Sequence, residues 1–220
     1  MSSQEPTFQF ERELAALGYK AVVGIDEVGC GSLAGPVVAG AVVLPPTFRF
    51  AGLRDSKLLT ALARERLSEE IKEKARSFAI GEADITEIAS MGLRRATLLA
   101  MRRALEKIKE IDFVLVDAWQ IPGIELPQKG IIRGDRTVKS IAAASIVAKV
   151  YRDAMMDDYD KEYPEYGFAE HKGYSTKKHL EAIKRFGPCS IHRTGWRTFQ
   201  PNIYDFLPTE ISANNSQETT

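Results

Sequence analysis

Residues 21–31 read Ala-Val-Val-Gly-Ile-Asp-Glu-Val-Gly-Cys-Gly, an apolar run that meets two adjacent acids and a glycine-rich turn. The valine and isoleucine content predicts a buried β-strand over 21–26. Ionised carboxylates at the end of a buried strand need compensation, because burying a charge without a partner is costly. Two interpretations follow: Asp26 and Glu27 bind a cation, or they are solvated at a surface strand end.

The composition limits the class of protein. A chain of 220 residues, 44% of them apolar, can form one domain with a sizeable core. Thirty basic residues balance thirty acidic ones, so the net charge does not by itself indicate binding to nucleic acid. Two cysteines exclude a disulfide framework and a cysteine-based zinc site. We find no signal-peptide pattern and no apolar run long enough to span a membrane, and we expect a cytoplasmic protein.

Strands and helices alternate along the rest of the chain. The apolar pattern predicts further strands at 37–44, 77–83, 113–117 and 131–135, and helices at 8–17, 59–75, 91–108, 138–163 and 176–186. This order predicts an α/β fold, in which a mixed β-sheet is flanked by helices and a small basic helical subdomain lies near the C-terminus.

Three of the predicted strands end in carboxylates: Asp26 with Glu27, Asp117, and Asp135. In α/β proteins the loops at strand ends converge, and chemistry collects there. Carboxylates brought together in this way raise one another's pKa unless cations intervene. An all-oxygen ligand set favours Mg²⁺ or Mn²⁺ over zinc, and a pair of such ions is suited to phosphodiester hydrolysis.

Adjacent strand residues point to opposite faces of a sheet, which leaves the role of Glu27 open. Its side chain reaches the site of Asp26 if the strand ends there. Otherwise Glu27 contributes its backbone carbonyl, or its side chain turns around the sheet edge. A lone aspartate can also be a helix cap or a turn former, and it is the repetition at three strand ends that favours metal binding.

The glycine-rich turn also fits another pattern. Residues 29–34 match the G-x-G-x-x-A fingerprint of dinucleotide-binding folds, directly after a strand. That fingerprint requires a helix next, so that a pyrophosphate can sit on its N-terminus. Gly35, Pro36 and a β-rich run follow instead, which disfavours the dinucleotide interpretation.

Six stretches of the chain match the motifs of one family in order. They are residues 24–37, Asp55-Ser56-Lys57, the strand 114–117, Gly134-Asp135, the helix at 140–153, and 171–176. Together, over about residues 20–199, they resemble the type 2 ribonucleases H, the bacterial ribonuclease HII family.

The resemblance implies a ribonuclease H fold and an endoribonuclease that hydrolyses RNA in RNA–DNA hybrids. It also implies incision 5′ of a single ribonucleotide in duplex DNA, by two-metal-ion catalysis that leaves 3′-hydroxyl and 5′-phosphate ends. The catalytic, metal-binding acids are then Asp26, Glu27, Asp117 and Asp135, holding two ions of Mg²⁺ or Mn²⁺.

The same resemblance implies the substrate contacts. The turn Gly29-Cys30-Gly31 would read the ribose 2′-hydroxyl, the group that distinguishes RNA from DNA. Tyr174 would stack on the sugar after the ribonucleotide, and Lys57 would contact the backbone near the scissile phosphate.

One position departs from the family pattern, because Cys30 occupies the middle of a turn that is usually Gly-Arg-Gly. If main-chain groups read the 2′-hydroxyl, we expect reduced affinity with the selectivity for the ribonucleotide junction retained. The alternative function is a catalytically weakened protein of the same fold that binds hybrids.

The sequence pattern and the resemblance together suggest how the chain is divided. We expect an N-terminal helical extension at 1–18, a ribonuclease H-like catalytic domain at 19–168, a basic substrate-binding segment at 169–207 and a disordered tail at 208–220. We expect a monomer.

The basic segment contains further candidates. Its cations predict a surface for the DNA backbone, and we expect His171, His179 and His192 at the surface or on phosphates rather than on a metal, because their spacings suit no common site. Residues 200–207 loosely fit a glutamine-led peptide that binds the sliding clamp.

Overall fold

The computed structural model describes residues 5–49, 60–196 and 199. Five strands form one sheet in the order β3-β2-β1-β4-β5. Their bounds are β1 Val22–Val28, β2 Val37–Val43, β3 Ser77–Ala83, β4 Phe113–Asp117 and β5 Gln128–Ile131. The first three strands pair antiparallel, whereas β4 and β5 run parallel to β1. The mixed α/β sheet predicted from the sequence is therefore confirmed.

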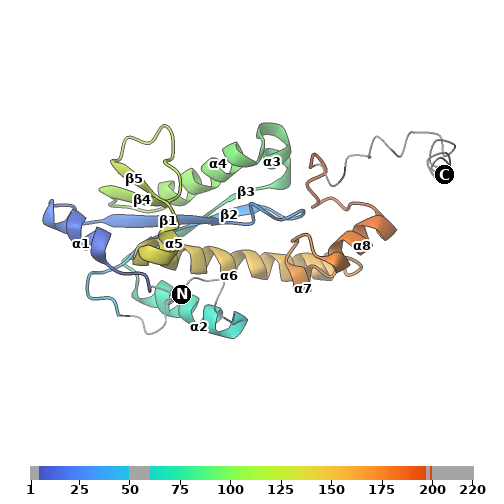
Figure 1. Cartoon of the computed structure of the whole chain (residues 1–220), viewed down its shortest axis with the longest axis horizontal. Coiled ribbons are helices and arrows are strands. Elements are labelled where there is room, and N and C mark those ends of the chain that lie inside the picture. Colours follow the sequence, from blue (N-terminus) through green and yellow to red (C-terminus); the bar gives the residue numbers. More distant parts are fainter. Residues whose placement is uncertain (1–4, 50–59, 197–198, 200–220) are drawn as a thin grey trace, which may run out of the picture.

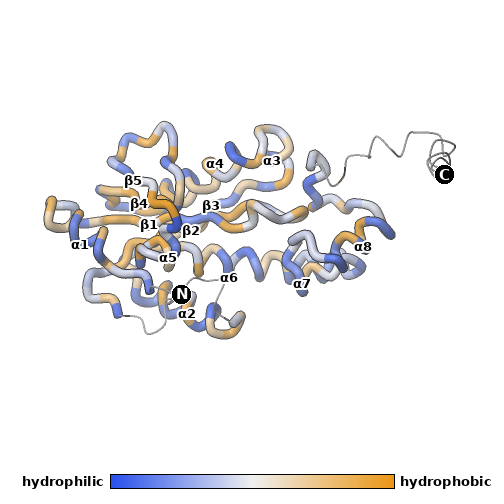
Figure 2. The backbone as a smooth tube through the Cα atoms, in the orientation of Figure 1, coloured by the Kyte–Doolittle hydropathy of each residue, from blue (hydrophilic) through white to orange (hydrophobic). Residues whose placement is uncertain are grey.

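Helices cover both faces of the sheet (Figure 1). The helices are α1 Gln9–Ala16, α2 Ala61–Lys74, α3 Ile85–Met91, α4 Leu93–Glu106, α5 Gly134–Thr137, α6 Lys139–Glu162, α7 Phe168–His171 and α8 Lys177–Phe186. Helix α4 packs on β2 and β3 from one side, and α6 packs on β1 and β2 from the other, with α2 against its outer surface. Figure 2 shows apolar residues concentrated along the strands between these two helical layers.

Small residues bring α6 unusually close to the sheet. A Cβ at Gly24 of β1 would lie 2.2 Å from the carbonyl carbon of Ser140, and one at Gly40 of β2 would lie 2.3 Å from the carbonyl oxygen of Ala144. Both positions therefore require glycine. The close packing fixes α6 relative to the end of β1, and that end carries the two adjacent acids.

The structure corrects three of the expected elements. Strand β1 does not end at Asp26 but continues to Val28. The helix expected at 91–108 is interrupted at Gly92, whose φ of +81° separates α3 from α4. The strand expected at 131–135 is wrong beyond Ile131, because Arg133 adopts a left-handed conformation and Asp135 lies in the short helix α5.

The C-terminal helices follow the sequence pattern more closely. Helix α8 begins after Thr176, whose hydroxyl accepts a hydrogen bond from the backbone N–H of His179 at 3.2 Å, as expected of an N-cap. The tail expected to be disordered at 208–220 lies outside the described residues. No helix in the described part of the chain has the length and apolar character that crossing a membrane requires.

Candidate active site

A cavity of about 540 Å³ opens where β1 and β4 end. Its walls bring together all four acids named from the sequence and three further groups of interest: the turn Gly29-Cys30-Gly31, Tyr174, and the α6 side chains Ser145 and Lys149. Lys57, the other substrate contact expected, lies outside the described residues. Residues from five separate parts of the chain thus share one site.

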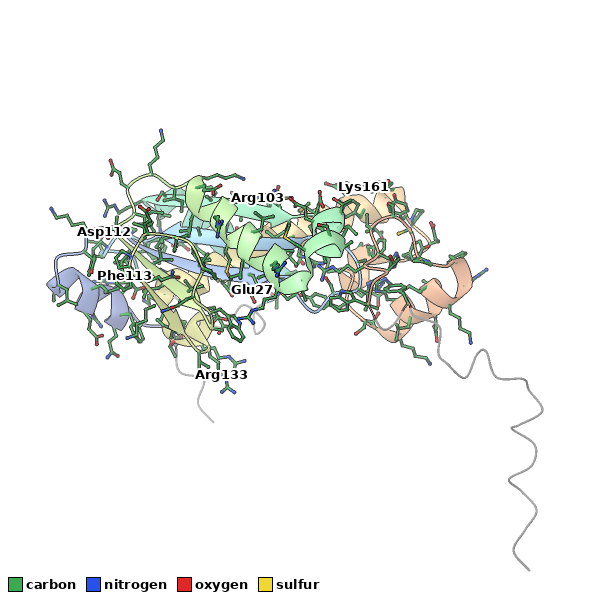
Figure 3. The ribbon with its side chains drawn as sticks, turned by 90° about the horizontal axis from the view of Figure 1, so that it is seen from above. Glu27, Arg103, Asp112, Phe113, Arg133 and Lys161 are labelled. Atoms are coloured by element: carbon green, nitrogen blue, oxygen red, sulfur yellow. The ribbon has the colours of Figure 1, made fainter. Side chains whose placement is uncertain are left out.

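The unequal lengths of β1 and β4 explain how two adjacent acids reach one cavity. Pairing between these strands stops at Ile25 and Val116, while β1 continues alongside β2 to Val28. From Asp26 onward the β1 edge that faces β4 is therefore open. Asp26 and Glu27 both line the cavity, and Figure 3 shows Glu27 near the middle of the molecule, beside α4.

A hydrogen bond links Asp117, at the end of β4, to the short helix that carries Asp135. The Asp117 carboxylate accepts a 2.6 Å bond from the backbone N–H of Gly134, the first residue of α5. A Cβ at Gly134 would lie 2.6 Å from Cδ1 of Ile141 in α6, so glycine here lets α5 pack closely on α6. The hydrogen bond to Asp117 places buried Asp135 beside the end of β4, although it comes from a helix and not from a strand.

The electrostatics of the cavity centre on Asp26, which is 5% exposed. Burial raises its pKa well above the usual value, and the neighbouring carboxylates Glu27, Asp117 and Asp135 raise it further. A hydrogen bond from the Ser145 hydroxyl opposes this shift. A cation bound in the cavity would offset the mutual repulsion of these carboxylates.

The donor set fits a hard divalent cation, because every candidate ligand is a carboxylate oxygen. Over the described residues, no three His, Cys, Asp or Glu side chains are grouped closely enough to form a ready-made metal site. The acids line the cavity walls instead, as expected of carboxylates that repel one another. Asp26, Glu27, Asp117 and Asp135 are the residues that would hold the metal.

Two buried arginines, which the sequence reasoning did not identify as site residues, hold the glycine-rich turn. Arg152 of α6 is fully buried and donates hydrogen bonds to the carbonyl oxygens of Pro36, Ala34 and Lys172 and to the Ser32 hydroxyl, at 2.7–3.0 Å. Gly29 packs directly on it, since a Cβ there would lie 2.3 Å from Nε of Arg152.

Arg193 holds the same turn from the C-terminal segment. Its guanidinium donates to the Gly35 carbonyl at 2.7 and 3.0 Å and to the Cys30 carbonyl at 3.3 Å. Burial lowers its pKa to about 10, so it stays charged at neutral pH. The alternation of glycines in the turn was visible in the sequence, but the arginines that fix it were not.

The Cys30 side chain lies between α4 and Glu27. Its thiol lies 3.3 Å from the Thr97 hydroxyl of α4 and 3.9 Å from the Glu27 carboxylate. Burial and the nearby Glu27 raise its pKa to about 11, which keeps the thiol protonated at neutral pH. Cys30 therefore offers the cavity its main-chain groups and a neutral side chain.

The expectation that the three histidines lie at the surface is wrong. His171, His179 and His192 are all buried, and the ring of His171 stacks on that of His179 with centroids 4.3 Å apart. The loops around α7 and α8 bring them together, which spacing along the chain does not reveal.

His179 and His192 form a hydrogen-bonded chain that ends at Tyr174. The Tyr174 carbonyl can only accept, so Nδ1 of His179 donates to it at 2.9 Å. Nε2 of His192 then donates to Nε2 of His179 at 3.0 Å, and Nδ1 of His192 accepts from the Cys189 N–H at 2.9 Å. The two bonds accepted by ring nitrogens, at Nε2 of His179 and at Nδ1 of His192, require neutral imidazoles.

The basic segment is only partly available to phosphate. Arg193 is buried, while Lys178 pairs with Glu170 at 2.6 Å, Lys177 with Glu181 at 3.8 Å and Lys172 with Asp157. The lysines of the surface expected for the DNA backbone are therefore partly paired with acids, which lie on α6, on α7 and on α8 itself.

Comparison with solved structures defines the class of protein. The chain is similar to the ribonuclease H2 from Pyrococcus horikoshii OT3, with a TM-score of 0.70 at 25% identity, covering 82% of this chain and 95% of that one. It also resembles the ribonuclease HII in a complex with PCNA from Archaeoglobus fulgidus, with a TM-score of 0.67 at 24% identity, over 84% and 100% of the two chains. A third similar structure is Bst-RNase HIII in complex with Mn²⁺, with a TM-score of 0.64 at 18% identity, over 84% and 70%. The fold is that of the ribonucleases H.

Sequence comparison narrows the class to one family. A family model described as Ribonuclease HII matches residues 23–199. The ribonuclease HII of Desulfitobacterium hafniense (strain DSM 10664 / DCB-2) is 50% identical over 198 residues, 90% of this chain and 75% of the relative. That of Syntrophotalea carbinolica is 50% identical over 189 residues, 86% and 90% of the two chains. The chain belongs to the ribonuclease HII family, and it is an endoribonuclease that acts on RNA in RNA–DNA hybrids.

Proposed function

We propose that Asp26, Glu27, Asp117 and Asp135 hold two divalent cations and cleave a phosphodiester 5′ of a ribonucleotide, in hybrids and at single ribonucleotides in duplex DNA. The observation that carries this proposal is the shared cavity, in which the buried Asp26 lies among the other three carboxylates. When bound, the ions would activate water and stabilise the departing oxygen.

The protein's own groups would select the ribonucleotide. Arg152 and Arg193 hold the backbone of the turn at residues 29–36, so its main-chain groups are already oriented before the substrate arrives. A main-chain group can bond a 2′-hydroxyl and finds no partner on a deoxyribose. The selectivity then resides in the backbone, which Cys30 leaves intact.

Tyr174 would support the neighbouring sugar. A Cβ at Gly31 would meet the Tyr174 ring at 4.0 Å, so the ring lies directly against the turn. The backbone also joins the two, through a β-bridge between Ser32 and Tyr174. A sugar that enters the cavity beside the turn would therefore meet the aromatic face.

The metal is proposed as Mg²⁺ or Mn²⁺. The carboxylate donors suit both ions, and the similar Bst-RNase HIII structure contains Mn²⁺. Cleavage rates measured in each metal, and in chelator, decide between them.

The substrate class is tested with two duplexes, one holding a single ribonucleotide in DNA and one a continuous RNA–DNA hybrid. We expect both to be cut in the presence of divalent metal, with 3′-hydroxyl and 5′-phosphate ends and incision 5′ of the single ribonucleotide. Binding to both duplexes without cleavage of either would instead favour the weakened hybrid-binding protein that Cys30 suggests.

A sliding clamp is a second proposed partner. A similar solved structure is a complex of PCNA with a ribonuclease HII, and the candidate clamp-binding peptide at 200–207 lies outside the described residues. We expect a Phe206→Ala substitution to abolish capture of the chain by immobilised sliding clamp. Capture that is unaffected by this change would remove the peptide from the proposal.

A further inference from the structure

A second cavity, of about 280 Å³, adjoins the catalytic one. Glu27 and Cys30 line both, so the two cavities meet across the end of β1. The second cavity runs between α4 and the loop that follows β4, and the catalytic acids other than Glu27 are not part of its lining. Whatever enters it lies next to the reacting phosphate without contacting Asp26, Asp117 or Asp135.

An aromatic ring and a guanidinium form its rim. The guanidinium carbon of Arg94 lies 4.9 Å from the centroid of the Trp119 ring, a cation–π contact between α4 and the loop. The indole is nevertheless 58% exposed, which is unusual for the largest apolar side chain. Arg94 is exposed as well, so both groups are available to a ligand.

The backbone holds the indole in this position. Ala118, between Asp117 and Trp119, adopts a left-handed φ of +58°, a conformation that costs a residue with a side chain about 1 kcal/mol or more. Its N–H is bonded to the Ile131 carbonyl at 2.9 Å, and the Trp119 N–H is bonded to the Asp117 carbonyl at 2.7 Å. The turn that places Trp119 over α4 therefore begins at a metal-binding acid.

The lining of the cavity selects the ligand chemistry. Beneath the pair it is largely apolar, with Leu93, Leu98, Met101 and Pro122, and Arg94 supplies a positive charge at the rim. In a duplex the bases are paired inside, so the part of the substrate that can reach a side cavity is the sugar–phosphate backbone. A phosphate matches the guanidinium, and a deoxyribose, which lacks the 2′-hydroxyl, matches the apolar wall.

We propose that the Arg94–Trp119 pair is a subsite for a phosphodiester and its adjoining deoxyribose, next to the catalytic cavity. The proposal rests on the proposed function for the nature of the substrate. The deoxyribose belongs to the DNA flanking a ribonucleotide or to the complementary strand, and the test distinguishes these two sources.

Binding is measured in chelator, where no cleavage occurs, with a duplex that contains one ribonucleotide. We expect Arg94→Ala to weaken binding about tenfold and to reduce the slope of log K against log salt by about 0.9, the loss of one phosphate contact. Trp119→Ala should weaken binding about fivefold, because the guanidinium loses its support. The matched control is Arg95→Ala, which removes the same charge from the next position of α4, outside the cavity.

Single methylphosphonates, which make one phosphate neutral, then locate the contact. One position, in either the ribonucleotide-containing strand or its complement, should weaken binding to the wild type and have no further effect on the Arg94→Ala variant. Equal effects of Arg94→Ala and Arg95→Ala would overturn the subsite, and so would the absence of any such position. The proposed function fails separately, if the wild type binds the duplex but does not cleave it when metal is added.

Discussion

Asp26 is a buried carboxylate whose nearest charged neighbours are also carboxylates, so at the residue scale function works against stability. Burial and the three other acids raise its pKa, which means that holding it ionised at neutral pH costs folding free energy when no cation is bound. A bound metal ion that neutralises the cluster would offset this cost. Stability and metal binding are therefore linked at this one side chain.

Replacing Asp26 with asparagine should separate the two effects. Asparagine keeps the shape of the side chain and an oxygen that can accept the 2.8 Å bond from the Glu27 N–H. In chelator at pH 7.5 we expect Asp26→Asn to raise the Tm by about 2–4 °C, because a repelling buried charge is gone. In excess Mg²⁺ the wild type should recover that difference. A lower Tm for the variant in chelator would show that the Asp26 charge is compensated within the protein.

Cys30 tests whether selectivity resides in the backbone. We expect Cys30→Arg to tighten binding several-fold by adding a charge that can meet a phosphate, and to leave the incision site unchanged, because the turn is fixed by Arg152 and Arg193. Cys30→Ala separates loss of the thiol from gain of charge. If Cys30→Arg created junction cleavage that the natural chain lacks, the side chain would be the reader and this account of selectivity would be wrong.

At the scale of elements, the site depends on β1 extending beyond its pairing with β4. Because β1 continues two residues past Asp26 while its pairing with β4 stops before it, the sheet edge opens where two adjacent acids stand. The sequence left open how Glu27 reaches the site of Asp26. The structure shows that the strand does not end there and that Glu27 nevertheless lines the cavity.

The predictability of each element follows from what determines it. The bounds of β3 and β4 were predictable to the residue, because apolar strands end at breakers and acids that are local in the sequence. The placement of Asp135 was not predictable, because it depends on the left-handed backbone of Arg133. No glycine stands at that position to indicate such a conformation from the sequence. The arginines under the turn and the buried histidines were missed for another reason: tertiary packing brings together loops far apart in the chain.

The histidine chain predicts how stability depends on pH. Burial lowers the pKa values of His179 and His192 from 6.5 to about 4, and the neighbouring ring of His171 lowers both further. The folded pKa values lie below the unfolded ones, so this stability is present above pH 6.5 and is lost as the pH falls toward 4.

Urea unfolding at pH 7.5, 6.0 and 5.0 measures this effect. We expect the wild-type free energy of unfolding to fall through this range, and a His179→Gln, His192→Gln double variant to be less stable at pH 7.5 but to show a flatter pH dependence. Parallel curves for the two proteins would mean that the histidines do not titrate as the geometry requires.

At the scale of the whole molecule, binding to a polyanion has to arise from local charge, since 30 basic and 30 acidic residues cancel. Glu170 on α7 and Glu181 on α8 pair with lysines of the C-terminal segment, and each such pair competes with a phosphate. We therefore expect these ion pairs to lower the affinity of the chain for nucleic acid.

Removing two of these acids should strengthen binding. In a Glu170→Gln, Glu181→Gln variant, Lys178 and Lys177 are released, and at low salt we expect the Kd for duplex to fall about two- to fivefold with a steeper salt dependence. A Glu69→Gln, Glu70→Gln variant, which releases Lys72 and Lys74 on α2, is the matched control and should change the Kd little. An equal gain in affinity from both variants would mean that net charge alone explains the effect.

The most direct test of the central claim is cleavage of a duplex holding one ribonucleotide by the wild type and by an Asp26→Asn, Asp117→Asn double variant, in Mg²⁺, in Mn²⁺ and in chelator. The account predicts incision 5′ of the ribonucleotide by the wild type with metal only, and none by the variant although it still folds and binds the duplex. Cleavage by the variant, or by the wild type in chelator, would contradict a metal-dependent mechanism carried by these acids.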